Sequence, residues 1–106
     1  MVTIRLIDNI DSRLAQTGQR FQASVDLPVV IGGRTAIAQG AGARVVLNNF
    51  GNQVRLELVS ISANGTNHIV RSNVFEKQGT IRGKPSPFVI VPPDTRIQFT
   101  LLTPIT

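Results

Sequence analysis

The sequence predicts a small all-β domain, and three observations support this. Apolar and polar residues alternate with a period of two over several short stretches, turn-forming residues separate those stretches, and no stretch shows the period of an amphipathic helix. The length of 106 residues fits one domain. We therefore expect a single domain over residues 1–106, a closed or nearly closed antiparallel barrel of about 7–8 short strands, with a β-sandwich as the alternative.

The first half of the chain predicts two strands and a hairpin. Apolar residues alternate with polar ones over residues 2–10 and again over residues 21–25, and the short polar side chains at 8–12 favour a turn between them. Pro28 limits the second strand to an edge or a bend, because proline has no N–H to donate to a ladder. Gly32-Gly33 stands between two apolar runs and predicts a tight hairpin over residues 29–38.

The strongest hairpin signal is Asn64-Gly65, which separates two long runs. We expect antiparallel strands near residues 53–63 and 66–76. A shorter strand precedes them at residues 43–47, and two more follow at 88–91 and 96–102. In the last of these, the alternation predicts that Ile97, Phe99 and Leu101 face the core.

Composition excludes several functional classes. The five Phe residues are the only aromatic ones, so the core must be aliphatic, and the absence of Cys rules out a disulfide or a cysteine metal site. One His makes a structural zinc site improbable. No apolar run has the length of a membrane-spanning helix, and the chain as given begins without the apolar region of a signal peptide. We expect no metal, no cofactor and no small-molecule substrate.

The residues that could support catalysis have simpler explanations. His68 is the only side chain that ordinarily titrates near neutrality, but it follows a turn and no nucleophile motif lies near it in sequence. Asp8 and Asp11 fit a turn-capping role, and Asp26 completes the set of carboxylates that would have to converge for acid–base chemistry. Gly32-Gly33 lacks the residues of a phosphate-binding loop. We expect a protein that is not an enzyme.

The one functional lead is a basic segment at residues 77–87. The net charge is +5, and nine of the eleven cationic residues are arginines that mostly stand far apart. Lys77, Arg82 and Lys84 form the local cluster, within a Gly- and Pro-containing stretch that we expect to be a mobile loop. We identify these three residues as a candidate contact for an anion or a partner. With Phe75 and Phe88 beside the segment, nucleic acid is the alternative ligand.

Two parts of the chain together resemble a family. Residues 6–47 contain a strand ending in Ile10-Asp11-Ser12, then Gly18, Phe21 and Ala23, followed by Pro28 and a glycine hairpin. The tail, FVIVPPDTRIQFTLLTPIT, has a matching Pro-Pro-acid-Thr-Arg pattern. Both resemble uncharacterised β-barrel domains of the bacterial cell envelope. A more distant likeness is to the barrel domain of conjugation and type IV secretion channel proteins.

The resemblance implies a periplasmic or envelope location and a structural or interaction role. It implies no catalytic residue. Many such domains carry a glycine-zipper insert and follow an export signal; in this chain residues 77–87 occupy the position of the insert, and the chain as given shows no such signal. We therefore expect a non-enzymatic structural or protein-interaction domain that binds a protein partner or another copy of itself, with a small basic nucleic-acid-binding barrel as the alternative.

Overall fold

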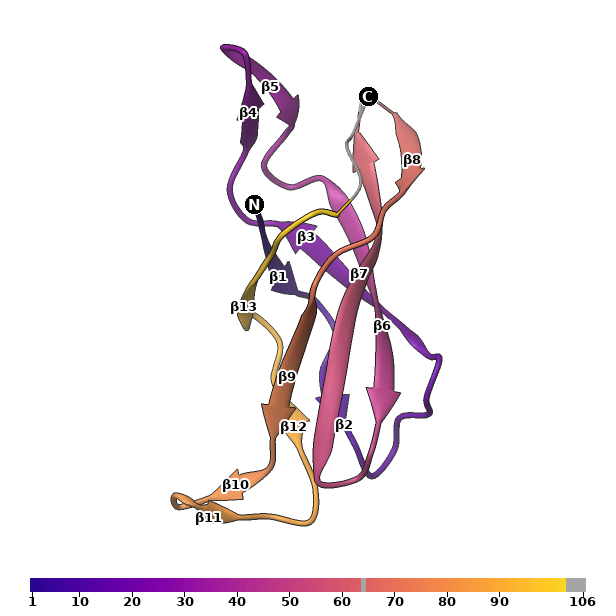
Figure 1. Cartoon of the computed structure of the whole chain (residues 1–106), viewed down its shortest axis with the longest axis vertical. Helices are drawn as coiled ribbons and strands as arrows, with labels where there is room; N and C mark the ends of the chain where they lie inside the picture. Colours follow the sequence, from indigo (N-terminus) through magenta and orange to yellow (C-terminus); the bar gives the residue numbers. More distant parts are fainter. Residues whose placement is uncertain (64, 103–106) are drawn as a thin grey trace.

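The computed structural model of the protein describes residues 1–63 and 65–102 (Figure 1). Within these residues the chain forms strands and no helix, so the predicted all-β class is confirmed. The strands are β1 (Val2–Leu6), β2 (Ile10–Asp11), β3 (Arg20–Val25), β4 (Val29–Ile31), β5 (Arg34–Ile37), β6 (Gly42–Asn49), β7 (Gln53–Ala63), β8 (Thr66–Ile69), β9 (Val74–Gln78), β10 (Thr80–Ile81), β11 (Lys84–Pro85), β12 (Ile90–Val91) and β13 (Arg96–Phe99).

The main sheet is an open half-barrel. Its strands run β13-β1-β3-β6-β7-β8, β9 pairs with the other half of β7, and all pairs are antiparallel. The expectation of a closed or nearly closed barrel is therefore wrong. The returning strands β12 and β13 pair with β2 and β1 and not with β9, which leaves a gap in the wall between β9 and β12.

Alternating residues of the main sheet build one aliphatic core. The register places inward-facing residues opposite each other across neighbouring strands, for example Ile4 between Ile97 and Val25, and Leu47 opposite Leu56. All of these side chains are buried, as are Ile97 and Phe99, while Leu101 is half-buried against the core. The period-two alternation in the sequence thus located the core face correctly on these strands.

A β-bulge in β7 keeps its apolar residues on the core face, although the period of two in the sequence is interrupted at Val59. The register with β6 shifts between Arg44 and Val45, so that Val59 is an extra residue on β7. Without it, Ile61 would face the opposite side from Leu58, yet both side chains are fully buried. The bulge also increases local twist, which helps the sheet to curl.

The hairpin β4–β5 stands apart from the main sheet as a two-stranded arm at one end of the molecule (Figure 1). Gly32 and Gly33 have φ values of 60° and 78°. Positive φ at both central residues is what a tight two-residue hairpin turn requires, as predicted for this pair. Pro28 lies where the chain leaves the sheet after β3, as predicted. We call residues 27–37 the arm.

The predicted strand at 66–76 is divided into β8 and β9. Both pair with β7, but the register changes across residues 70–73, where two more residues are accommodated. Ser72 stabilises the break, since its buried hydroxyl accepts a bond from Leu58 N–H at 2.9 Å and donates to Asn73 O at 2.8 Å. Gly65 has the expected positive φ, and Asn64 of the predicted turn lies outside the described residues.

The basic segment at 77–87 contains a short hairpin and is not an irregular loop. Strands β10 and β11 pair through the turn at Arg82 and Gly83, whose φ values are 52° and 77°. Ser86 N–H donates to Gly79 O at 2.9 Å, which ties the base of the hairpin. Two residues with positive φ allow the tight turn that the sequence analysis did not predict here. The mobility of the segment stays a prediction.

Candidate interaction surfaces

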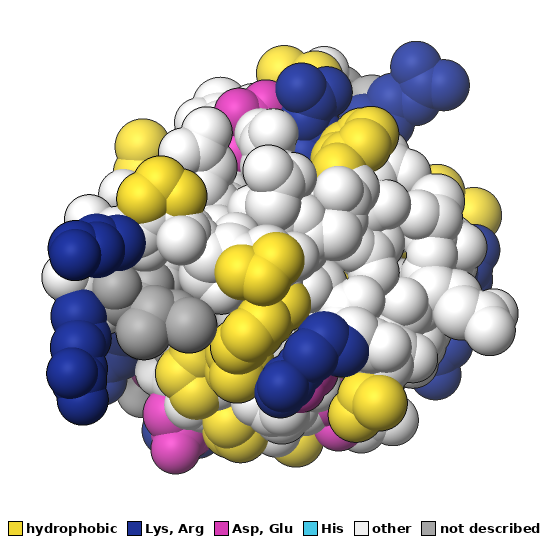
Figure 2. Space-filling view, turned by 90° about the horizontal axis from the view of Figure 1, so that it is seen from below, with side chains coloured by type: hydrophobic (Ala, Val, Ile, Leu, Met, Phe, Trp, Pro, Cys, Tyr) yellow, Lys and Arg dark blue, Asp and Glu magenta, His cyan; other side chains and the backbone are white. Residues whose placement is uncertain are grey.

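The three cations predicted as a contact site lie together at the end of the molecule opposite the arm. Lys77 is the fourth residue of β9, Arg82 is in the β10–β11 turn, and Lys84 begins β11; all three are exposed. Figure 2 looks at this end and shows Lys and Arg side chains around a strip of hydrophobic ones. We call the surface formed by Lys77, Arg82, Lys84, Phe50 and Phe88 the basic end.

Two arginines stack on phenylalanines at this end. The guanidinium carbon of Arg13 lies 4.1 Å from the centre of the Phe88 ring, and that of Arg55 lies 5.3 Å from the centre of the Phe50 ring. Sequence reasoning considered Phe88 as a flanking residue but missed both pairs. Arg13 and Phe88 are distant in sequence, so only the tertiary fold brings them together.

A carboxylate holds Arg13 in place over Phe88. Asp11 accepts bonds from Arg13 Nη2 at 2.7 Å and from Arg13 Nε at 3.0 Å, a two-pronged contact of the kind that fixes a guanidinium plane. These bonds, and a further one from the backbone N–H of Arg13, hold the pKa of Asp11 below its ordinary value. The pair therefore stays ionised at neutral pH.

A hydrogen-bond network beneath the basic end joins three distant segments. The buried hydroxyl of Ser12 donates to Gly51 O and accepts from Val89 N–H, both at 2.8 Å. The Asn49 side-chain amide donates to Ser12 O at 2.8 Å and to Ala15 O at 2.9 Å. The turn at residues 12–15 is thereby fixed to the β6–β7 turn and to the chain before β12.

Replacing Ser12 with alanine is expected to lower the free energy of unfolding by about 1–3 kcal/mol. The change removes two hydrogen bonds and leaves the Val89 N–H without this acceptor in a buried position. Urea unfolding followed by circular dichroism measures the loss. Ser24→Ala, outside this network, should change the stability by less than about 0.5 kcal/mol; equal losses in both variants would show that the network contributes nothing specific.

A groove opens at the gap in the half-barrel wall. It has a volume of about 360 Å³ and lies between two chain segments. One wall is the end of β9 and the start of β10, including Lys77 and Gly79, and the other is the approach to β12, including Phe88 and Ile90. The walls combine a cation, an aromatic ring and strand edges.

The end of the molecule that carries the arm, which we call the arm end, has a second groove. This groove is apolar. Its volume is about 570 Å³, and its lining includes β4 and β5 residues, the first two residues of the chain, and Leu101 and Leu102. Five side chains at this end are between 55% and 74% exposed, which is high for large apolar residues: Met1, Leu27, Val30, Ile31 and Leu102. Exposed apolar side chains gathered around one groove are typical of an interaction surface.

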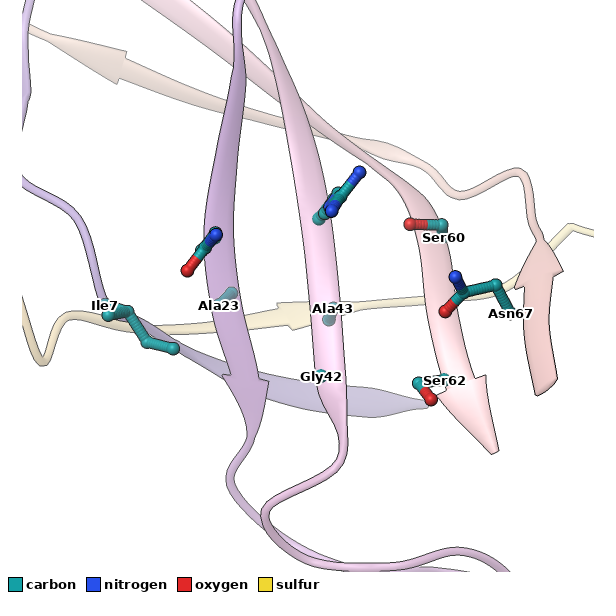
Figure 3. Close-up of a pocket in the computed structure, with 9 residues that line it drawn as sticks. Ile7, Ala23, Gly42, Ala43, Ser60, Ser62 and Asn67 are labelled. Atoms are coloured by element: carbon teal, nitrogen blue, oxygen red, sulfur yellow. The ribbon is translucent and has the colours of Figure 1, made fainter. Parts of the chain in front are cut away.

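A third hollow of about 210 Å³ lies on the sheet over β3, β6, β7 and β8 (Figure 3). The small residues Ala23, Gly42 and Ala43 form its floor, and Ser60, Ser62 and Asn67 lie at its polar side. Over the described residues, no buried side-chain polar atom lacks a hydrogen-bond partner. Within the described residues, the hollow therefore offers no buried, unpartnered polar side-chain atom to a ligand.

The residues considered for catalysis do not converge. Asp8 accepts a bond from Gln22 N–H at 2.9 Å, Asp11 binds Arg13, and Asp26 pairs with Arg96 at 3.1 Å. Asp11 also accepts the backbone N–H of Arg13 two residues on, the turn role predicted for it. His68 is on the edge strand β8, opposite Ile61.

Within residues 1–63 and 65–102, no group of three or more His, Asp or Glu side chains gathers in a way that could hold a metal ion. In the same part of the chain, we find no helix with the length and apolar character needed to cross a bilayer.

Comparison with known proteins yields no match: no family model fits the chain, and no curated protein and no solved structure is similar to it.

Proposed function

We propose that this chain is a non-enzymatic protein-interaction domain that associates with a second copy of itself through the arm end. The observation that carries the proposal is the exposed apolar surface around the 570 Å³ groove. A location in the bacterial cell envelope is part of the proposal and is supported by the resemblance of the two ends of the chain to envelope domains.

The arm end has the shape of a self-complementary surface. The hairpin β4–β5 is a projecting ridge whose outer edges pair with no other strand among the described residues, and the groove lies directly beside it. A surface that offers both a ridge and a groove can meet its own copy about a two-fold axis, each arm filling the groove of the other. Burying the apolar side chains there is favourable by about 25 cal/mol for each Å² removed from water.

Charge does not oppose this contact. The whole chain carries +5, but Arg34 is the one charged residue of the arm between 27 and 37. Asp26 and Arg96 at the base of the arm neutralise each other. The cluster of Lys77, Arg82 and Lys84 lies at the opposite end of a molecule whose longest dimension is 45 Å, so it is remote from this contact.

Sedimentation velocity over a range of protein concentrations tests the proposal. The unaltered chain should shift from monomer to dimer as concentration rises, and Val30→Asp should abolish the shift because it places a charge in the apolar contact. Leu14→Asp is the matched control: Leu14 is 82% exposed and lies outside the arm, so this variant should dimerise normally. A chain that stays monomeric at the highest concentration, or two variants that behave alike, would refute self-association through the arm.

Nucleic-acid binding at the basic end is the second candidate. Phe50 is 58% exposed, which favours it because an exposed ring beside cations can stack a base. Against it, Arg55 already covers one face of that ring, and Arg13 covers one face of Phe88. The experiment in the next subsection separates this candidate from a peptide ligand.

A further inference from the structure

The two sides of the gap in the half-barrel meet at two places. At one end, Ser72 forms a bridge with Leu101, Asn73 N–H donates to Thr100 O at 3.1 Å, and Thr100 N–H donates to the Asn73 side chain at 2.8 Å. At the basic end, the backbone of Gly79 lies against the carbonyl group of Phe88, and the 360 Å³ groove lies along this contact. Figure 1 shows β9 and β12 side by side there.

The edge of β9 that faces the gap carries main-chain groups with no partner strand. Over the described residues β9 pairs with β7 alone. Gly79 N–H donates to Asn52 O at 2.9 Å, so the N–H group of this residue points toward the β7 side. Because hydrogen-bonding direction alternates along an antiparallel strand, Glu76 and Gln78 direct their N–H and C=O groups away from β7. Such an edge can accept one more strand.

The walls of the groove would recognise alternate side chains of that strand. Lys77 lies on the same face of β9 as Phe75, and it lines the groove together with Phe88 and Ile90. Ile90 is 43% exposed, so it offers apolar contact, while Lys77 offers a positive charge. Neighbouring strands place opposed side chains about 4.5–5.5 Å apart, which is within reach of an ion pair with Lys77.

The charges around the groove favour a negatively charged ligand. Glu76 is paired with Arg55 at 2.9 Å and Asp11 with Arg13 at 2.7 Å, so both nearby carboxylates are neutralised. Lys77, Arg82 and Lys84 form no ion pair within the part of the chain that the structure describes. An acidic partner would therefore meet uncompensated positive charge.

We propose that the groove binds an extended acidic segment of a partner protein, which adds a strand to the free edge of β9 and alternates carboxylate and apolar side chains. The five residues of β9 span about 17 Å at roughly 3.4 Å per residue, so a segment of similar length suffices. The Arg13 contact holds the Phe88 wall in place before the ligand arrives. This site is at the opposite end from the arm and is independent of self-association.

An NMR titration of the ¹⁵N-labelled chain with a capped peptide of alternating glutamate and valine tests the proposal. Amide shifts should concentrate in β9 and around Phe88–Ile90. The same peptide with N-methyl groups along one edge should fail to bind, because it cannot form the strand ladder, although its charge is unchanged. Lys77→Glu should weaken binding about fivefold or more through loss and reversal of one exposed charge contact.

Matched controls make the outcomes distinct. Arg34→Glu changes the net charge equally but lies on the arm, so it should bind the peptide as the unaltered chain does. The spectra of both variants show directly whether each remains folded. The proposal is wrong if the peptide causes no shifts in β9, if the N-methylated peptide binds equally well, or if only single-stranded oligothymidylate shifts these amides. None of these results bears on dimerisation at the arm.

Discussion

Replacing Phe99 with alanine is expected to lower the free energy of unfolding by about 3–5 kcal/mol. Phe99 is the largest fully buried side chain of the core, and it lies on β13 opposite Val2 of β1. Its removal leaves a cavity where the returning end of the chain packs against its beginning. Chemical denaturation with urea, with the slope compared between variants, gives the change.

Phe50→Ala is the matched control for Phe99→Ala. The same side chain is removed, but Phe50 is 58% exposed at the β6–β7 turn and contributes chiefly its contact with Arg55. We expect a loss of no more than about 1 kcal/mol. If Phe99→Ala were as mild as Phe50→Ala, the assignment of β13 to the wall of the core would be incorrect.

Gly79→Ala is expected to cost about 3 kcal/mol, or to prevent the β10–β11 hairpin from seating against the sheet. A Cβ atom at this position would lie 2.0 Å from the carbonyl oxygen of Phe88 and 2.9 Å from that of Ser86. Both are backbone atoms, so neither can rotate away. Thermal unfolding measures the stability, and the NMR signals of residues 79–90 show whether the hairpin has moved.

Gly42→Ala separates this clash from the general effect of losing a glycine. Gly42 begins β6, has no atom within 4 Å of a built Cβ and has no positive φ. Alanine there should be neutral or stabilising by about 0.4–1 kcal/mol, because it restricts the unfolded chain. A neutral Gly79→Ala variant would mean that the close approach of residues 79 and 88 does not exist.

The elements that the sequence predicted correctly are those with a local cause. Alternation located β1, β3 and β7 and the faces that they bury, and Gly32-Gly33 located the arm. The hairpin at Arg82-Gly83 was missed because arginine rarely adopts positive φ, so the pair lacked the usual turn signal.

The features that were missed depend on contacts between distant segments. The half-barrel stays open because β12 pairs with β2, a choice that no local pattern reveals. For the same reason the sequence grouped Lys77, Arg82 and Lys84 but gave no indication of the strand edge beside them. The sequence also did not indicate the apolar arm end. Val30 and Ile31 are apolar, as core residues are, and only the structure shows that the arm leaves the main sheet and exposes them.

The central claim, that the arm end is an interaction surface for a second copy, is tested most directly by recording the amide NMR spectrum at increasing protein concentration. The account predicts progressive shifts confined to β4, β5 and the neighbouring residues 101–102, with the basic end unchanged. Spectra that do not depend on concentration, or shifts centred on β9 to β12 instead, would contradict it.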